Sequence, residues 1–160
     1  MDSGMSVSQI HIIDKLRKEI LSLQGLASAV QGHHTITGLG PIQDAFPNRI
    51  FPLRAIHEFQ VSMPQHRMST AGFIAGMLST IMRRRGVVIW IGSKLQFLPH
   101  AFNTFGIDPD KIIFVSPDRE KDALWAIEES LKCEGLSAVV GELHGLSFDF
   151  SRRLQLAGEI

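Results

Sequence analysis

The run of apolar residues at positions 87–91, VVIWI, is the feature of this sequence that most limits its fold. A strand without polar alternation is typical of a parallel sheet that is covered by helices on both faces. An apolar segment of helical length, residues 68–82, precedes this run, and a strand candidate at residues 55–59 precedes that segment. The order of strand, helix and strand predicts a β-α-β unit with a right-handed crossover.

The same alternation continues towards the end of the chain. We expect a helix near residues 95–105, a strand at 111–115, a helix at 118–133, a strand at 136–140 and a final helix at 151–160. The pattern therefore predicts an α/β fold with a mostly parallel sheet flanked by helices. Because such sheets bind ligands at the carboxyl ends of their strands, we expect any chemistry in the turns that follow the strands.

The first forty residues follow a different pattern. An amphipathic helix is predicted over residues 9–23, with Ser8 as its N-cap and apolar residues at three- and four-residue spacing. Residues 25–40 are rich in Gly, Ser, His and Thr, which is typical of a linker. We therefore divide the chain into a helix with a linker at 1–40 and an α/β domain at 41–160. The helix either packs on that domain or contacts a partner.

Composition excludes several classes of function. The 160 residues include 16 Lys and Arg and 16 Asp and Glu, so no overall field attracts nucleic acid or an acidic membrane. No segment resembles a signal peptide or a membrane span. The single cysteine, Cys133, is interpreted as a small buried residue in a reducing compartment, and no metal-ligand spacing is present. We expect a cytoplasmic protein without a metal or cofactor.

The turn at residues 61–70, VSMPQHRMST, lies where a phosphate-binding loop is expected, between a strand and a helix. Such a loop needs glycines for an anion-binding nest, a lysine for the phosphates and a Ser or Thr for Mg²⁺. This turn contains no glycine and no lysine. We interpret it as a degenerate nucleotide loop whose candidate residues are Pro64, His66, Arg67, Ser69 and Thr70. In the alternative, it is a polar turn in which Ser69 or Thr70 caps the helix.

Three further groups of charged residues are candidates for function. Glu142 follows the strand at 136–140, where a Walker B acid would meet Mg²⁺, although an acid that is solvated or bonded to the neighbouring turn fits the sequence equally. Two basic clusters could contact DNA phosphates or acidic partners, or be solvated helix ends. They are Arg83, Arg84 and Arg85, and then Arg152 and Arg153.

Three segments in the second half of the chain carry a family resemblance. DALWAIEESL at residues 122–131, GEL at 141–143 and SRRLQLA at 151–157 occur in this order. They resemble motifs of the ImuA family, which is similar to RecA and occurs in bacterial operons for DNA-damage mutagenesis. The resemblance covers residues 51–160 and implies a RecA-like P-loop NTPase core. Members of the family continue beyond the last motif, so the chain resembles an N-terminal fragment.

The resemblance implies a role in SOS mutagenesis, while the residues argue against catalysis. In a RecA core the acid that polarises the attacking water follows the second strand, whereas residues 91–94 contain no carboxylate. We therefore expect a non-enzymatic accessory or adaptor protein of error-prone DNA repair by translesion synthesis. Its expected partners are RecA or an ImuB-like polymerase homologue, and DNA contact and self-association stay open.

Two alternative functions stay open. A divergent RecA-like ATPase would use Arg67 or Lys94 in place of the missing lysine, and weak binding of ATP is compatible with this reading. A cell-division inhibitor related to SulA would share a similar fold.

Overall fold

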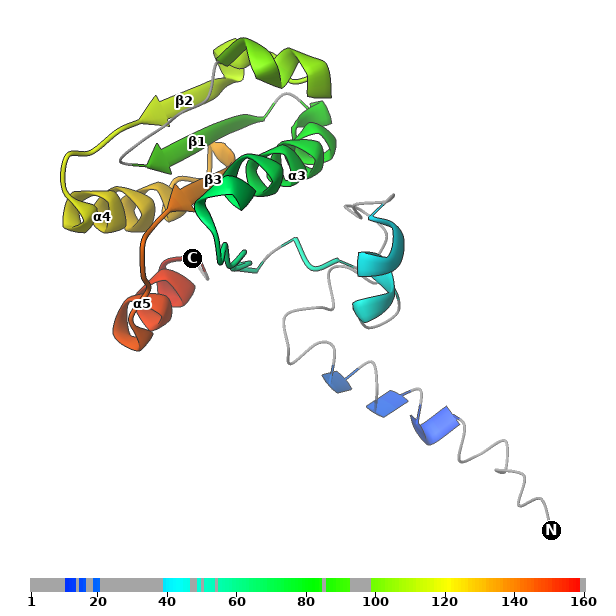
Figure 1. The fold of residues 1–160 in the computed structure, drawn as a ribbon. Coiled ribbons are helices and arrows are strands. Elements are labelled where there is room, and N and C mark those ends of the chain that lie inside the picture. The colour runs from blue at the N-terminus through cyan, green and yellow to red at the C-terminus, as the bar shows by residue number, and fades with distance from the viewer. Residues whose placement is uncertain are drawn as a thin grey trace. The chain divides into compact units, whose positions relative to one another are not determined.

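The computed structural model describes residues 11–13, 15–16, 19–20, 39–46, 49, 51–53, 55–84, 86–92 and 99–158 (Figure 1). The chain divides into two compact units, Met1–Arg54 and Ala55–Ile160. In the first unit the described residues 11–13, 15–16 and 19–20 are helical, as the amphipathic pattern predicts. The linker predicted at 25–40 lies outside the described residues except at its last two positions.

The first unit also contains a short 3-10 helix, η1, at Gly40–Ala45. Pro41 lies in its first turn, where the fixed φ of proline suits a helix and its missing N–H leaves no donor unsatisfied. Gly40 adopts a φ of 57°, which glycine tolerates without strain. An ion pair of 2.8 Å joins Arg49 to Asp44 of this helix.

The second unit is built on a three-stranded parallel sheet in the order β2-β1-β3, so that β1 lies in the middle (Figure 1). The strands are β1 at Val87–Gly92, β2 at Ile112–Val115 and β3 at Leu136–Glu142. Val88 pairs with Ile112 and Trp90 pairs with Val140. The apolar run at residues 87–91 therefore forms the central strand, and the α/β class and parallel sheet are confirmed.

Three α-helices cover the two faces of this sheet: α3 at Arg67–Ile81, α4 at Glu120–Leu131 and α5 at Phe148–Gly158. Side chains of β1 alternate between two cores. Val88 and Trp90 pack with the buried face of α3, while Ile91 packs with α4 and α5. The continuous apolar run follows from this arrangement, because both faces of β1 are buried.

Shorter 3-10 helices connect these elements: η3 at Pro64–His66, η4 at Met82–Arg84, η5 at Pro99–Phe105 and η6 at Pro109–Lys111. The helix expected near 95–105 is thus a 3-10 helix at its described end. No helix among the described residues is long and apolar enough to cross a membrane.

The strand predicted at residues 55–59 and the burial of Cys133 are wrong. Residues 55–59 are irregular and pair with no described strand, so Ile56 and Phe59 stay exposed. The strand that would lead into a phosphate loop is therefore missing from the described sheet, and a RecA-like core is not confirmed. Cys133 is exposed rather than buried, because α4 ends at Leu131 and the cysteine lies in the following turn.

Candidate functional site

Three elements of the second unit meet at the carboxyl end of the sheet, where parallel sheets hold their ligand sites. Glu142 is the last residue of β3, and its backbone neighbour on the central strand is Gly92, the last residue of β1. Arg67 is the first residue of α3. Glu142 and Arg67 thus lie at the ends of regular elements, and the geometry of the sheet and the helix positions them.

Both carboxylate oxygens of Glu142 accept a hydrogen bond. Arg67 Nη2 donates to Oε2 at 2.7 Å, and Trp90 Nε1 donates to Oε1 at 2.8 Å. The two donors come from different directions, one from the start of α3 and the other from the central strand β1. We call these three residues the Glu142 cluster.

The Glu142 cluster is only partly shielded from solvent. The side chain of Glu142 is 22% exposed and that of Arg67 is 38% exposed, whereas Trp90 is almost fully buried. A carboxylate in such a position is costly unless its charge is balanced and its lone pairs are bonded. The guanidinium balances the charge of Oε2 and the indole N–H donates to Oε1, so both oxygens of Glu142 have a partner within the cluster.

The backbone of the preceding turn does not form a phosphate cradle. An anion-binding nest needs neighbouring residues of right- and left-handed conformation so that successive N–H groups converge. Arg49 is the non-glycine residue with a positive φ among the described residues, and it lies outside this turn. Pro64 has no N–H, and the His66 N–H already donates to the Met63 carbonyl at 2.9 Å within η3.

The predicted loop residues lie in η3 and at the start of α3. The interpretation of Ser69 or Thr70 as a helix cap is wrong: α3 begins at Arg67, its N-cap is His66, and no side chain caps it. Ser69 and Thr70 lie within the first turn and a half of the helix, because Pro64 starts a 3-10 turn that runs directly into α3. Lys94, the other predicted substitute for a lysine, lies outside the described residues.

A hollow of about 400 Å³ lies beside the first turns of α3 and is open to solvent. Phe59 and Phe73 form its apolar wall, with ring centroids 5.8 Å apart in an edge-to-face arrangement. Its remaining lining comes from Glu58, Gln60, Ser69 and Thr70. Among its described lining residues the charged side chain is that of Glu58, and a carboxylate repels a phosphate group.

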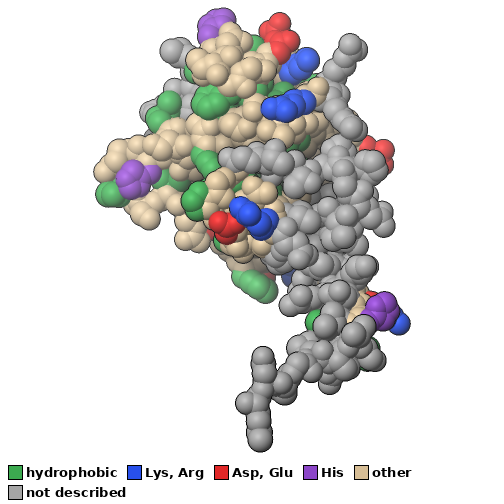
Figure 2. All heavy atoms as spheres, turned by 90° about the vertical axis from the view of Figure 1, so that its right-hand side faces the viewer, with side chains coloured by type: hydrophobic (Ala, Val, Ile, Leu, Met, Phe, Trp, Pro, Cys, Tyr) green, Lys and Arg blue, Asp and Glu red, His purple; other side chains and the backbone are tan. Residues whose placement is uncertain are grey.

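The basic clusters are not brought to the Glu142 cluster. Arg83 is exposed in η4, at the opposite end of α3 from Arg67, which a 15-residue helix places roughly 22 Å away. The side chain of Arg84 and all of Arg85 lie outside the described residues. On the face in Figure 2, described acidic and basic side chains lie beside one another and form no patch of one sign.

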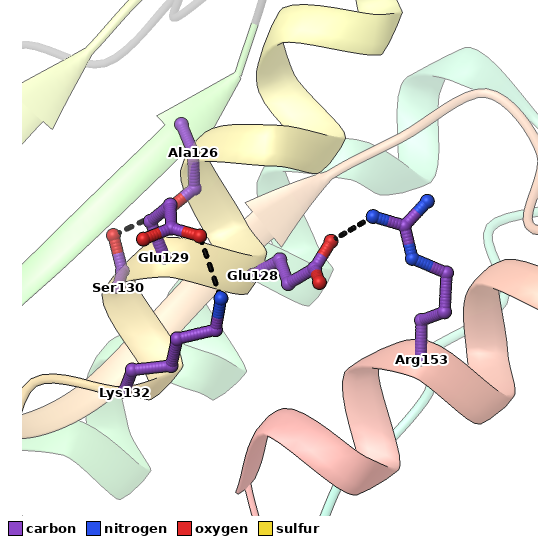
Figure 3. A network of polar contacts seen from close by, with 6 residues as sticks. All are labelled: Ala126, Glu128, Glu129, Ser130, Lys132 and Arg153. Atoms are coloured by element: carbon purple, nitrogen blue, oxygen red, sulfur yellow. Dashed lines mark hydrogen bonds and ion pairs between the residues drawn. The ribbon is translucent and has the colours of Figure 1, made fainter.

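Arg152 and Arg153 lie on α5 and differ in their surroundings. Arg153 forms an ion pair with Glu128 on α4 and lies over the ring of Phe150, 5.3 Å from its centroid (Figure 3). Arg152 is exposed and forms no ion pair with any described residue. The pair formed by Arg153 already balances its charge, so this residue acts as a link between two helices.

Sequence reasoning missed Trp90 as a partner of Glu142. One signal could have found it: a tryptophan in the middle of a buried strand carries an N–H that needs an acceptor, and the nearest strand-end acid is a candidate. Glu142 accepts hydrogen bonds from the first residue of α3 and from the central strand, and its Walker B role stays a prediction. Among the described residues, no group of His, Cys, Asp or Glu could hold a metal ion.

Comparison with known proteins finds a relationship in sequence. Protein ImuA from Caulobacter vibrioides, in strain NA1000 and in strain ATCC 19089, is 26% identical to this chain over 121 residues, which is 74% of the chain. The match supports an ImuA-family assignment. The motif resemblance to ImuA is therefore confirmed. The chain spans 50% of the length of these ImuA proteins, and no model of a known protein family matches it.

A solved structure shows the same fold. The crystal structure of SulA from Pseudomonas aeruginosa superposes with a TM-score of 0.55 at 18% identity, covering 68% of this chain and 90% of SulA. At this level of identity the likeness concerns the fold alone. The chain thus combines an ImuA-like sequence with a SulA-like arrangement of a three-stranded parallel sheet and helices.

Proposed function

We propose that this protein is a non-enzymatic accessory protein of the DNA damage response that acts in error-prone translesion synthesis. The similarity to ImuA supports the process, and the Glu142 cluster supports the absence of catalysis. Its partners are RecA or an ImuB-like polymerase homologue, which it binds as an adaptor. DNA contact is a weaker part of the proposal, since Arg153 is already paired.

The observation that carries this proposal is the ion pair between Arg67 and Glu142. In a P-loop enzyme the cation at the start of the helix contacts phosphates, and the strand-end acid positions Mg²⁺ and water. Here the cation and the acid bind each other at 2.7 Å. A nucleotide with Mg²⁺ would have to break this pair and also displace the Trp90 N–H from the other oxygen of Glu142. The turn offers no nest of N–H groups to compensate.

The enzymatic alternative is tested by ATP turnover. We expect no magnesium-dependent hydrolysis above background in the wild-type protein, and no saturable signal with a fluorescent ATP analogue. Glu142→Gln removes the charge of the acid, and Asp149→Asn, at an exposed acid in the first turn of α5, is its control. Turnover that is abolished by Glu142→Gln and kept by Asp149→Asn would establish a divergent RecA-like ATPase with Arg67 in the place of lysine.

The adaptor role is tested by partner capture. A tagged protein should recover RecA or the ImuB-like polymerase homologue from cells after DNA damage. Deletion of residues 1–25 should weaken this recovery more than it lowers the melting temperature if the amphipathic helix contacts the partner. The reverse result would assign the helix to the protein's own core.

A second candidate function follows from the fold of SulA. A cell-division inhibitor would bind FtsZ in place of RecA. Capture of FtsZ from damaged cells, with no recovery of RecA or the polymerase homologue, would favour this function over the adaptor.

A further inference from the structure

The hollow beside the first turns of α3 carries a negative charge that no described residue balances. We call it the Phe59 hollow, and its described lining consists of Glu58, Phe59, Gln60, Ser69, Thr70 and Phe73. Glu58 forms no ion pair with a described residue, since the guanidinium of Arg67 is bound to Glu142 instead. The Gln60 amide donates to one carboxylate oxygen of Glu58 at 3.2 Å, but this donor is neutral. The charge of the hollow therefore favours a cationic ligand.

Two aromatic rings form the wall next to this carboxylate. Phe59 and Phe73 lie edge to face with their centroids 5.8 Å apart, and Phe59 keeps 37% of its surface exposed. The face of an aromatic ring attracts a cation, more often the guanidinium of arginine than the ammonium of lysine, because the flat guanidinium also stacks on the ring. An acid beside exposed aromatic surface thus fits an arginine side chain.

The polar groups of the hollow provide hydrogen-bond acceptors that match this ligand. Ser69 and Thr70 lie in the first turns of α3, and neither hydroxyl is bonded to another described residue. A guanidinium has five N–H donors in a planar fork and no acceptor. Its donors can reach the carboxylate of Glu58 and a hydroxyl oxygen at the same time, whereas an ammonium group presents its donors from a single point.

The surface around the hollow is larger than a free arginine would cover. Exposed apolar side chains stand next to the lining residues in the sequence: Ile56, Val61, Met63 and Met68. Residues 58–62 are irregular and form no backbone hydrogen bond with another described residue, so their main chain is open to an extended peptide. The size of this rim favours an arginine that belongs to a protein segment with apolar neighbours.

We propose that the Phe59 hollow binds an arginine side chain of a partner protein. The guanidinium pairs with Glu58 and stacks on Phe59, and apolar side chains on either side of the arginine cover the exposed rim. This surface uses no residue of the Glu142 cluster, and the proposal holds whatever process the partner acts in.

The experiment is a titration of the isotope-labelled full chain with the capped tripeptide Leu-Arg-Leu, followed by the NMR shifts of its backbone amides. We expect saturable binding with shift changes centred on residues 58–60 and 69–73. The peptide Leu-citrulline-Leu keeps the shape of the arginine without its charge and should bind about 10-fold more weakly, because it loses a charge-assisted hydrogen bond. Leu-Lys-Leu should bind about 3-fold more weakly, because it loses the stacking of the guanidinium.

Two variants assign the roles of the acid and the ring. Glu58→Gln should remove the preference for arginine over citrulline. Glu134→Gln, at an exposed acid just before β3 and hence at the opposite edge of the sheet, is its control and should keep that preference. Phe59→Leu keeps an apolar side chain and removes the ring, so binding should weaken by about 3-fold. Phe148→Leu, at an 80% exposed ring on α5, should have no effect.

Several results would overturn the proposal. They are a titration without saturation, shift changes centred outside the hollow, equal affinity for the arginine and citrulline peptides, a lysine peptide bound as tightly as the arginine peptide, and a preference for arginine that survives Glu58→Gln. Circular dichroism of every variant checks that it is folded. Because the titration contains no cellular partner, a failure to capture RecA or the polymerase homologue would refute the adaptor role and leave this proposal standing.

Discussion

The Glu142 cluster predicts a measurable coupling between two residues that are 75 positions apart in the sequence. The perturbation is a double-mutant cycle with Arg67→Met, Glu142→Gln and both together. Methionine keeps much of the aliphatic stem of arginine and removes its charge, while glutamine keeps the shape of glutamate. The coupling free energy of unfolding then reports on the ion pair with little change in packing.

The expected magnitude follows from the exposure of the two side chains. Fully exposed ion pairs contribute about 0.2–1 kcal/mol. Arg67 is 38% exposed and remains screened by solvent, while Glu142 is 22% exposed and its bond length of 2.7 Å is that of a charge-assisted hydrogen bond. We therefore expect a coupling of about 1 kcal/mol, at the upper end of the range for surface pairs.

A third variant separates the ion pair from the bond to Trp90. Glu142→Gln leaves an amide oxygen that can still accept from the indole N–H, whereas Glu142→Leu removes the acceptor that lies 2.8 Å from Trp90 Nε1. Because a buried donor that loses its acceptor costs about 1–3 kcal/mol, Glu142→Leu should be less stable than Glu142→Gln by about that amount. In a chain of this length each 1 kcal/mol lowers the melting temperature by about 2–4 °C.

The assay is urea denaturation followed by circular dichroism and by tryptophan emission, at low and high salt. The coupling should decrease at high salt because one partner is exposed. A coupling below about 0.3 kcal/mol, which is within the error of additivity, would refute the ion pair as a stabilising contact. A Glu142→Leu variant more stable than Glu142→Gln would refute the role of Trp90.

Three further changes test the packing of the sheet, the contact between α4 and α5, and the hydrophobic core. Gly86→Ala should destabilise the fold by about 1–3 kcal/mol, because its new Cβ would lie 2.5 Å from the Cβ of Ser137, and Ser137→Gly should restore stability in thermal melts. Arg153→Ala should cost about 1 kcal/mol through loss of the Glu128 pair and the contact with Phe150, whereas Arg152→Ala should leave the urea midpoint unchanged; equal effects would contradict the link between α4 and α5. Phe102→Ala removes a ring that is 4% exposed and should cost about 3–5 kcal/mol in calorimetry, while Phe148→Ala, at 80% exposure, should stay within about 0.5 kcal/mol of wild type.

Much of the fold could be predicted because its signals are local. The apolar run of β1 and the helical spacing of α4 are properties of a few consecutive residues, and they reflect burial on two faces and on one face respectively. The strand predicted at 55–59 failed for the opposite reason. Its residues are compatible with a strand, but pairing requires a neighbour in the sheet, and no described strand pairs with that segment.

The sequence by itself determined that the turn before α3 lacks the glycines and the lysine of a phosphate cradle, because their absence is a matter of composition. It also determined the ImuA resemblance, which consists of ordered motifs. Only the tertiary structure decided what Glu142 does. Arg67 and Trp90 lie 75 and 52 residues away from it in the chain, and they meet it because parallel strands bring their carboxyl ends to one edge, beside the start of a helix. These contacts depend on the register and packing of segments that are distant in sequence, so no local sequence pattern predicts them.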